Sequence, residues 1–153
     1  MRHSKSAMLT VALLVTSIYG QDAAAPAVAY KPAQAPGAPA QACPARFDFH
    51  PEKDGVYKPG GDVKAPKVKH SVPAELSAEA KTRGAFTPFT AVSKVSFVVD
   101  VQGVPQDICI MRPAGFGLDE EAAKAVRQYR FEPAKKSGAP VAARVAIEVG
   151  FKN

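Results

Sequence analysis

The chain has 153 residues, of which 20 are Lys or Arg and 14 are Asp or Glu, so its formal net charge is +6. This excess is modest, and it falls by two, to +4, if Arg2 and Lys5 leave with an export signal. The sequence has no helix-turn-helix, zinc-finger or RNP-type motif, which excludes the common modes of nucleic-acid binding.

The first 21 residues are predicted to be an export signal. Basic residues within positions 2–5 precede an apolar run over 8–19, and small and polar residues follow. This is the pattern of a secretory signal, whose apolar stretch is about 7–15 residues, whereas a bilayer span needs about 20. We expect an exported, periplasmic protein that is cleaved near Gly20 or Ala25. The alternative is an uncleaved anchor in the inner membrane.

Residues 22–58 are predicted to be an Ala/Pro-rich linker together with the segment that leads into a domain over residues 59–153. The stretch from 22 to 44 is mostly Ala and Pro and has almost no side chains able to build a core. Proline-rich segments extend by about 3.1 Å per residue, so this stretch would reach roughly 70 Å. We therefore expect a short stalk.

The beginning of the domain is predicted to hold a short strand and a short helix. The strand covers residues 63–69 and is broken by Pro66, because proline cannot donate to a sheet ladder. Ser77 is expected to cap a helix that runs to Arg83 and stops at Gly84.

A small basic run lies in the same region. It consists of Lys64, Lys67, Lys69 and His70. Such a run can meet an anionic partner. The simpler interpretation is a solvated strand edge that lysines protect from pairing with other chains.

The next segment is predicted to be a β-hairpin. Apolar residues alternate with more polar ones, which is typical of a strand with one buried face; they are Val95, Phe97, Val99 and Val101. Gln102 and Gly103 make the reversal, where glycine supplies the positive φ that tight turns need. Ile108 and Ile110 continue on the return strand.

An amphipathic helix is predicted from Leu118 to Arg130. Its apolar residues follow helical spacing, and they are Leu118, Ala122, Ala125, Val126 and Tyr129. Acidic residues open the helix and Arg127 and Arg130 close it, as the helix dipole favours, and Pro133 forbids its continuation. We expect Val126 and Tyr129 to lie against the strand that contains Phe97.

The chain ends in a long alternating strand. One face carries the apolar residues Val141, Ala143, Val145, Ile147, Val149 and Phe151, and the other is more polar. The order of elements predicts an α+β domain, in which a small antiparallel or mixed sheet of about three to four strands has two helices packed on one face.

Two blocks in this order, VSFVVDVQGVPQDICIMR and GLDEEAAKAVRQYRFEPA, make residues 63–152 resemble the C-terminal domain of the TonB energy-transducer family. The resemblance implies a protein that carries energy from an inner-membrane motor to outer-membrane receptors. It also implies that the last strand, over Val141 to Val149, binds an extended receptor peptide by β-augmentation. The residues implied as the binding edge are Val141, Ala143, Arg144, Val145, Ile147 and Val149.

A second class of function stays open, namely an adaptor or scaffold that uses the same fold without coupling to a motor. Under either function the implied partner is an outer-membrane receptor peptide or another envelope protein. A transducer would in addition bind inner-membrane motor proteins. An open strand edge also permits a homodimer by strand exchange.

Catalysis finds no support in the sequence. Zinc-ligand spacing, a Gly-x-Ser-x-Gly motif and a P-loop are all absent, so we expect no enzyme activity, no metal and no cofactor.

The chain has two cysteines, Cys43 and Cys109. An even number of cysteines in an exported protein favours a disulfide, which would close a loop of about 66 residues. If Ile108 and Ile110 face the helices, Cys109 points to the other face of the sheet, which Phe47 and Phe49 can fold back to cover. The alternative is a buried Cys109 and a free Cys43 in the linker.

Overall fold

The computed structural model describes residues 29–35, 38–48, 50–85 and 87–153. The predicted export signal, residues 1–21, lies outside the described residues. Within them, no helix has the length and apolar character needed to cross a membrane.

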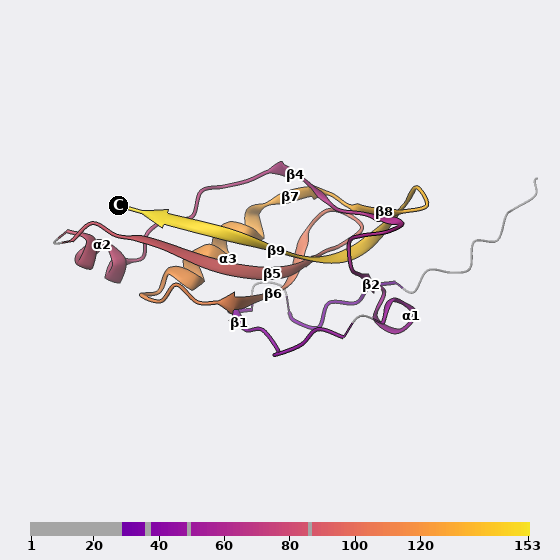
Figure 1. Cartoon of the computed structure of the whole chain (residues 1–153), viewed down its shortest axis with the longest axis horizontal. Coiled ribbons are helices and arrows are strands. Elements are labelled where there is room, and N and C mark those ends of the chain that lie inside the picture. The colour runs from indigo at the N-terminus through magenta and orange to yellow at the C-terminus, as the bar shows by residue number, and fades with distance from the viewer. Residues whose placement is uncertain (1–28, 36–37, 49, 86) are drawn as a thin grey trace, which may run out of the picture.

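The described chain forms three helices and nine strands (Figure 1). The helices are α1 (Pro51–Asp54), α2 (Ala78–Gly84) and α3 (Leu118–Gln128). The strands are β1 (Gln41–Ala42), β2 (Val56–Tyr57), β3 (Val63–Lys64), β4 (Lys67–His70), β5 (Thr90–Val99), β6 (Pro105–Arg112), β7 (Arg130–Glu132), β8 (Ala134–Lys136) and β9 (Ala139–Lys152).

The main sheet is mixed and has seven strands. Its order is β1-β6-β5-β9-β8-β3, and β2 also pairs with β9; β4 and β7 form a separate two-stranded sheet. Neighbours pair antiparallel except β1 with β6 and β2 with β9, which are parallel. The α+β class and the mixed sheet are thus confirmed, but the expected number of three to four strands is wrong. Only β5, β6 and β9 are long, and the additional strands have two to four residues each.

The hairpin between β5 and β6 turns at a position whose backbone conformation requires glycine. The N–H of Gly103 donates to the carbonyl of Asp100 at 3.0 Å, and Gly103 has φ +83°. A side chain here would also meet the carbonyl oxygen of Phe131, because an added Cβ would lie 1.9 Å from it. The predicted turn is therefore confirmed. Val101 was expected to face the core, but β5 ends before it and it is 42% exposed.

Both longer helices begin close to where the sequence places them. The Ser77 side chain accepts a hydrogen bond from the Ala80 N–H at 3.0 Å and so caps α2, whose last residue is Gly84. Helix α3 starts at Leu118 as expected but ends at Gln128, two residues early. Residues 130–132 instead form β7, which pairs with β4, so sheet pairing outcompetes the last predicted helical turn.

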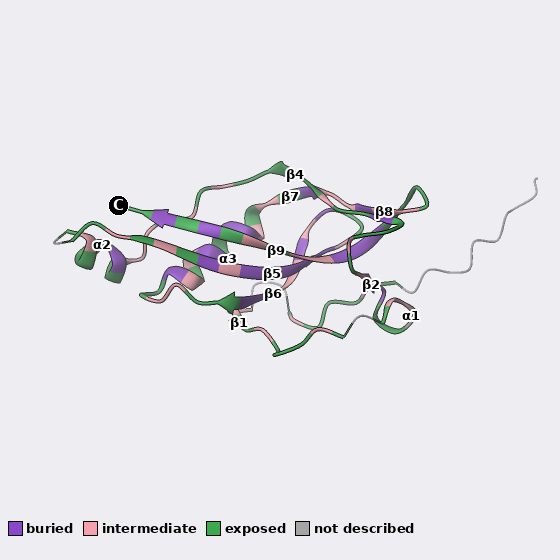
Figure 2. Ribbon diagram, viewed as in Figure 1, coloured by how far each residue is buried: buried purple, intermediate pink, exposed green. Residues whose placement is uncertain are grey.

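The main core lies between the long strands and these two helices. Its buried residues include Val95, Phe97 and Val99 of β5, Ala80 of α2, and Leu118, Ala122 and Val126 of α3. Val126 is 0% exposed and Tyr129 is partly buried against the same cluster, so the predicted contact of this helix face with β5 is confirmed. Figure 2 shows the resulting alternation of buried and exposed residues along β9.

The second face of the sheet is also covered, which the composition of residues 22–58 did not suggest. Val98 and Ala142 are buried there together with Val56 of β2, and Tyr30 packs against them. Strand β1 extends the sheet beside β6, where the Cys43 N–H donates to the Ile110 carbonyl at 2.9 Å. Over its described residues, the expected linker is therefore docked on the domain and is not a free stalk.

Candidate functional site

One edge of β9 is open over most of its length. The other edge pairs with β5 from Thr90 opposite Lys152 to Val99 opposite Ala143. On the open side, β8 pairs with residues 139–141 and β2 with residues 142–143. From residue 144 to 152 no described strand pairs with β9 on this side. These nine residues therefore present N–H and C=O groups that have no partner strand within the described chain.

The six residues implied as the binding edge divide into two groups. Arg144, Val145, Ile147 and Val149 belong to the open edge. The main chain of Val141 and Ala143 is already paired, with β8 and β2 respectively. The edge available to a guest strand is thus shorter than the predicted segment and begins at Arg144.

The side chains of the open edge have different environments on the two faces. Val149 and Phe151 are buried in the main core, and Val145 and Ile147 pack against it. These apolar residues therefore serve the fold whether or not a guest binds. On the other face, the exposed Glu148 pairs with Arg112 of β6 at 3.4 Å, an exposed ion pair that contributes little to stability.

Arg144 marks the start of the open edge and is held in place. Its guanidinium carbon lies 4.5 Å from the centre of the Phe47 ring, and Nη1 donates to the carbonyl of Asp107 at 3.4 Å. Burial lowers the pKa of Arg144, but an arginine stays protonated at neutral pH in proteins. The edge therefore begins beside a fixed positive charge.

A second constellation, centred on Asp107, fastens the N-terminal segment. Asp107 lies at a register shift between β5 and β6 and has φ +46°, a conformation that aspartate tolerates better than most residues. Its carboxylate accepts hydrogen bonds from the Tyr30 hydroxyl at 2.5 Å, the Ala33 N–H at 3.1 Å and the Gln34 N–H at 2.8 Å. We call Asp107 and these three partners the Asp107 clamp. Sequence reasoning missed it, because a single polar residue in a strand gives no signal of a long-range partner.

A disulfide reinforces the same attachment. Cys43 and Cys109 are joined, with their Cα atoms 4.9 Å apart. Ile108 and Ile110 belong to the helix-side core, so Cys109 reaches the opposite face, as the hairpin pattern suggested. Phe47 lies on that face against Arg144, whereas Phe49 is outside the described residues.

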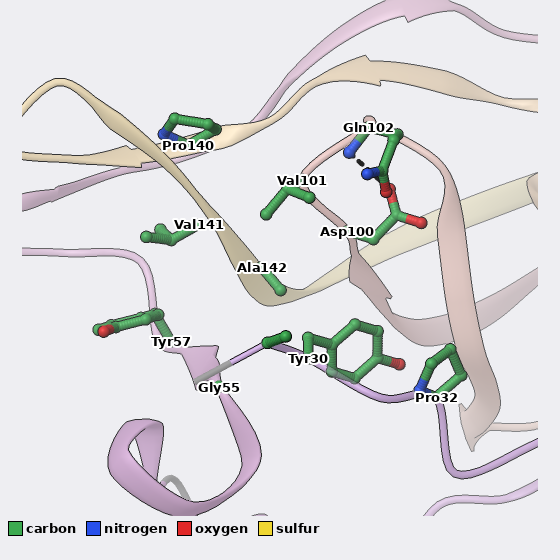
Figure 3. Close-up of a pocket in the computed structure, with 11 residues that line it drawn as sticks. Tyr30, Pro32, Gly55, Tyr57, Asp100, Val101, Gln102, Pro140, Val141 and Ala142 are labelled. Atoms are coloured by element: carbon green, nitrogen blue, oxygen red, sulfur yellow. Dashed lines mark hydrogen bonds between the residues drawn. The ribbon is translucent and has the colours of Figure 1, made fainter. Parts of the chain in front are cut away.

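A pocket of about 440 Å³ lies between this docked segment and the sheet (Figure 3). Its walls are mostly apolar or aromatic and come from Ala29, Tyr30, Pro32, Gly55, Tyr57, Val101, Pro140, Val141 and Ala142, with Asp100 and Gln102 on the hairpin side. The Asp100 carboxylate accepts from the N–H groups of Gln102 and Val104, so it closes the turn and is not directed at a ligand. Within the described residues, no group of three or more metal-binding side chains is found.

Titration of Tyr30 is expected to weaken the fold at alkaline pH. Burial of the phenol, its hydrogen bond to Asp107 and the charge of that carboxylate raise the pKa of Tyr30 above its ordinary value of about 10. The neutral phenol is thus favoured in the folded protein, and its stabilisation is complete below about pH 10 and is lost as the pH rises through the folded pKa. In urea denaturation, the stability difference between the wild type and Tyr30→Phe should be constant from about pH 7 to 9 and shrink above about pH 10. A difference that stays constant throughout would contradict this assignment.

Comparison with known proteins identifies the domain that carries β9. Residues 89–152, which span β5 to β9, match the family model described as Gram-negative bacterial TonB protein C-terminal. A search of curated proteins finds no match to the chain. The matched region contains the long hairpin, helix α3 and the whole open edge. Residues 89–152 of this chain therefore form a domain of the TonB C-terminal family.

Proposed function

We propose that this protein is an exported, periplasmic TonB-like protein that binds an extended peptide of an outer-membrane receptor and so supports energy-coupled transport. The observation that carries the proposal is the open edge of β9 over residues 144–152, within a domain of the TonB C-terminal family. The proposed role is that of a binding module and not of an enzyme.

The open edge has the length that strand addition needs. Nine residues of a strand span about 30 Å, and every second residue directs its N–H and C=O groups to the open side. Four or five residues therefore offer about eight to ten hydrogen-bonding groups, and each hydrogen bond contributes a net of about 0.5–1.5 kcal/mol, which gives a useful part of an affinity. Main-chain pairing confers little sequence specificity, which the guest side chains beside Arg144 must supply.

The proposal predicts a strong dependence on the guest's own main chain. In calorimetry with the full chain, a receptor peptide containing the family's recognition box should bind. Methylating the peptide nitrogens that face β9 should reduce its affinity at least about tenfold, which is about 1.4 kcal/mol. Methylating the alternate nitrogens, which face away, should change the affinity by no more than about threefold.

The protein variants provide matched controls for that experiment. Glu148→Ala should leave the affinity nearly unchanged, because its exposed side chain takes no part in main-chain pairing. Val145→Pro should damage binding and folding together, since proline removes a ladder donor from β9. Equal effects of the two methylation patterns would show that the peptide does not bind as an added strand.

The docked N-terminal segment favours a second candidate, an adaptor that engages envelope proteins without coupling to an inner-membrane motor. A stalk over residues 22–44 would extend far from the domain, but from Ala29 onwards the described chain is held on the sheet by the Asp107 clamp and the disulfide. Mass spectrometry of the mature N-terminus separates the two functions. Retention of residues 1–21 supports an anchored transducer with motor partners, and their removal supports the adaptor.

A further inference from the structure

Residues 63–70 and 130–136 pair along two successive antiparallel ladders, and we call these two segments the basic ribbon. The first segment contains β3 and β4, and the second contains β7 and β8 (Figure 1). They run antiparallel, from Val63 opposite Lys136 to His70 opposite Arg130. The ribbon is interrupted between its two halves, where each segment carries a proline, Pro66 in one and Pro133 in the other.

The basic ribbon concentrates positive charge. It contains six basic residues, Lys64, Lys67, Lys69, Arg130, Lys135 and Lys136, and one acidic residue, Glu132, a surplus of five charges in 15 residues. Lys135 pairs with Glu132 at 2.8 Å and Lys136 with Asp62 at 3.7 Å. The other four cations form no ion pair with any described residue. The ribbon thus holds most of the formal excess of +6 in the whole chain.

Protection of a strand edge does not account for this arrangement. Edge lysines repel other strands from the outer segment, 63–70. They do not explain Lys135 and Lys136, because β8 is paired on both sides, with β3 and β9. Lys64 also lies directly opposite Lys135, and like charges in such a cross-strand pair are destabilising. The ion pair of Lys135 with Glu132 offsets this repulsion, so the charge left for an anionic partner is that of Lys64, Lys67, Lys69 and Arg130, which form no ion pair with any described residue.

The outer segment also offers main-chain groups. All four residues of β4 are exposed, and Val68 is 56% exposed. Its one paired side faces β7, and no other described strand pairs with it. An extended peptide can hydrogen-bond to the side of β4 that faces away from β7, whereas a lipid headgroup or a compact anion cannot use a row of N–H and C=O groups.

We propose that the basic ribbon is a second docking surface, distinct from the β9 edge, which binds an acidic extended segment of another protein as a strand added beside β4. The acidic side chains of the guest lie over the lysines of the ribbon, and its main chain pairs with β4. This inference does not depend on receptor binding at β9.

The test uses the full chain and a fluorescein-labelled nine-residue peptide of alternating Glu and Val, followed by fluorescence anisotropy. Lys67→Glu/Lys69→Glu should reduce the affinity at least about tenfold. The matched control is Lys53→Glu/Lys81→Glu, which changes the net charge equally at exposed positions outside the ribbon and should alter the affinity by less than about threefold. Thermal melts of both variants establish that they fold.

Two further probes separate strand addition from simple charge attraction. A peptide of the same charge with a central proline should bind at least about tenfold more weakly, because it cannot pair continuously. Equal binding of the proline peptide would overturn the proposal. A second result would also overturn it. If the protein sediments with phosphatidylglycerol vesicles in a manner that depends on Lys67 and Lys69, and the acidic peptide fails to bind, the ribbon is a membrane-binding surface.

Discussion

Val126→Asp is expected to abolish cooperative folding of the domain. Val126 is 0% exposed and belongs to the cluster that joins α3 to β5 and β6. A carboxylate at this position would be buried in a hydrophobic cluster, and burying an unpaired charge costs several kcal/mol, a large share of the about 5–15 kcal/mol that stabilises a domain. Circular dichroism during heating should show no cooperative transition, and size-exclusion chromatography should show expanded or aggregated protein.

Lys124→Ala on the same helix is the control for this variant. The Lys124 side chain is 62% exposed and pairs with Glu121 at 2.7 Å. Exposed pairs of this kind contribute about 0–1 kcal/mol, so the variant should melt close to the wild type. A soluble Val126→Asp protein that unfolds cooperatively would show that this face of α3 is not the packing face.

Replacement of both cysteines, Cys43→Ala/Cys109→Ala, is expected to lower the free energy of unfolding by about 4 kcal/mol. The bridge joins residues 66 positions apart, and in the chain-entropy model a loop of this size restricts the unfolded chain by that amount. Cys109 is 4% exposed, so alanine is preferable to serine there because it buries no unpaired hydroxyl. Urea denaturation of the oxidised wild type and the double variant gives the difference.

A reducing agent provides the control for the cysteine experiment. Dithiothreitol should shift the urea midpoint of the wild type towards that of the double variant and leave the variant unchanged. Peptide mapping of the non-reduced protein should recover the two cysteines in one linked fragment. Free thiols at both positions, together with a wild-type midpoint that dithiothreitol does not move, would show that the bridge is not formed.

The elements that the sequence predicted well are those whose pattern is local. The spacing of Leu118, Ala122 and Val126 specifies a helix face, and the alternation from Val141 to Phe151 specifies a strand face, without knowledge of any partner. The helix face and the part of the strand face from Val145 to Phe151 lie in the main core, whereas Val141 and Ala143 belong to a smaller cluster with Val63 and Ala134. The resemblance to the TonB family also rests on the sequences of these two segments, and the matched region, residues 89–152, contains both elements.

The parts that the sequence did not predict depend on long-range pairing. Strands of two or three residues, such as β1 and β7, have no periodicity of their own and exist because β6 and β4 pair with them. Docking of the N-terminal segment needs few side chains: Tyr30 supplies the contact and Asp107, 77 residues away, supplies the acceptor. An Ala/Pro-rich composition conceals such anchors because they are too few to change the average. The open edge of β9 was shorter than expected for the same reason, since β2 belongs to the segment interpreted as linker.

The order of attachments along the N-terminal segment determines how the domain responds to tension from that side. Between Ala29 and Cys43 the segment is held by hydrogen bonds and packing, whereas at Cys43 it is joined covalently to β6. About 14 residues extended at about 3.3–3.6 Å each give roughly 50 Å of chain that can peel away before the covalent joint is loaded. Beyond that length, the load enters the sheet through β6, which is separated from β9 by β5. The segment can therefore act as an extensible tether while the strand that carries the open edge keeps its shape.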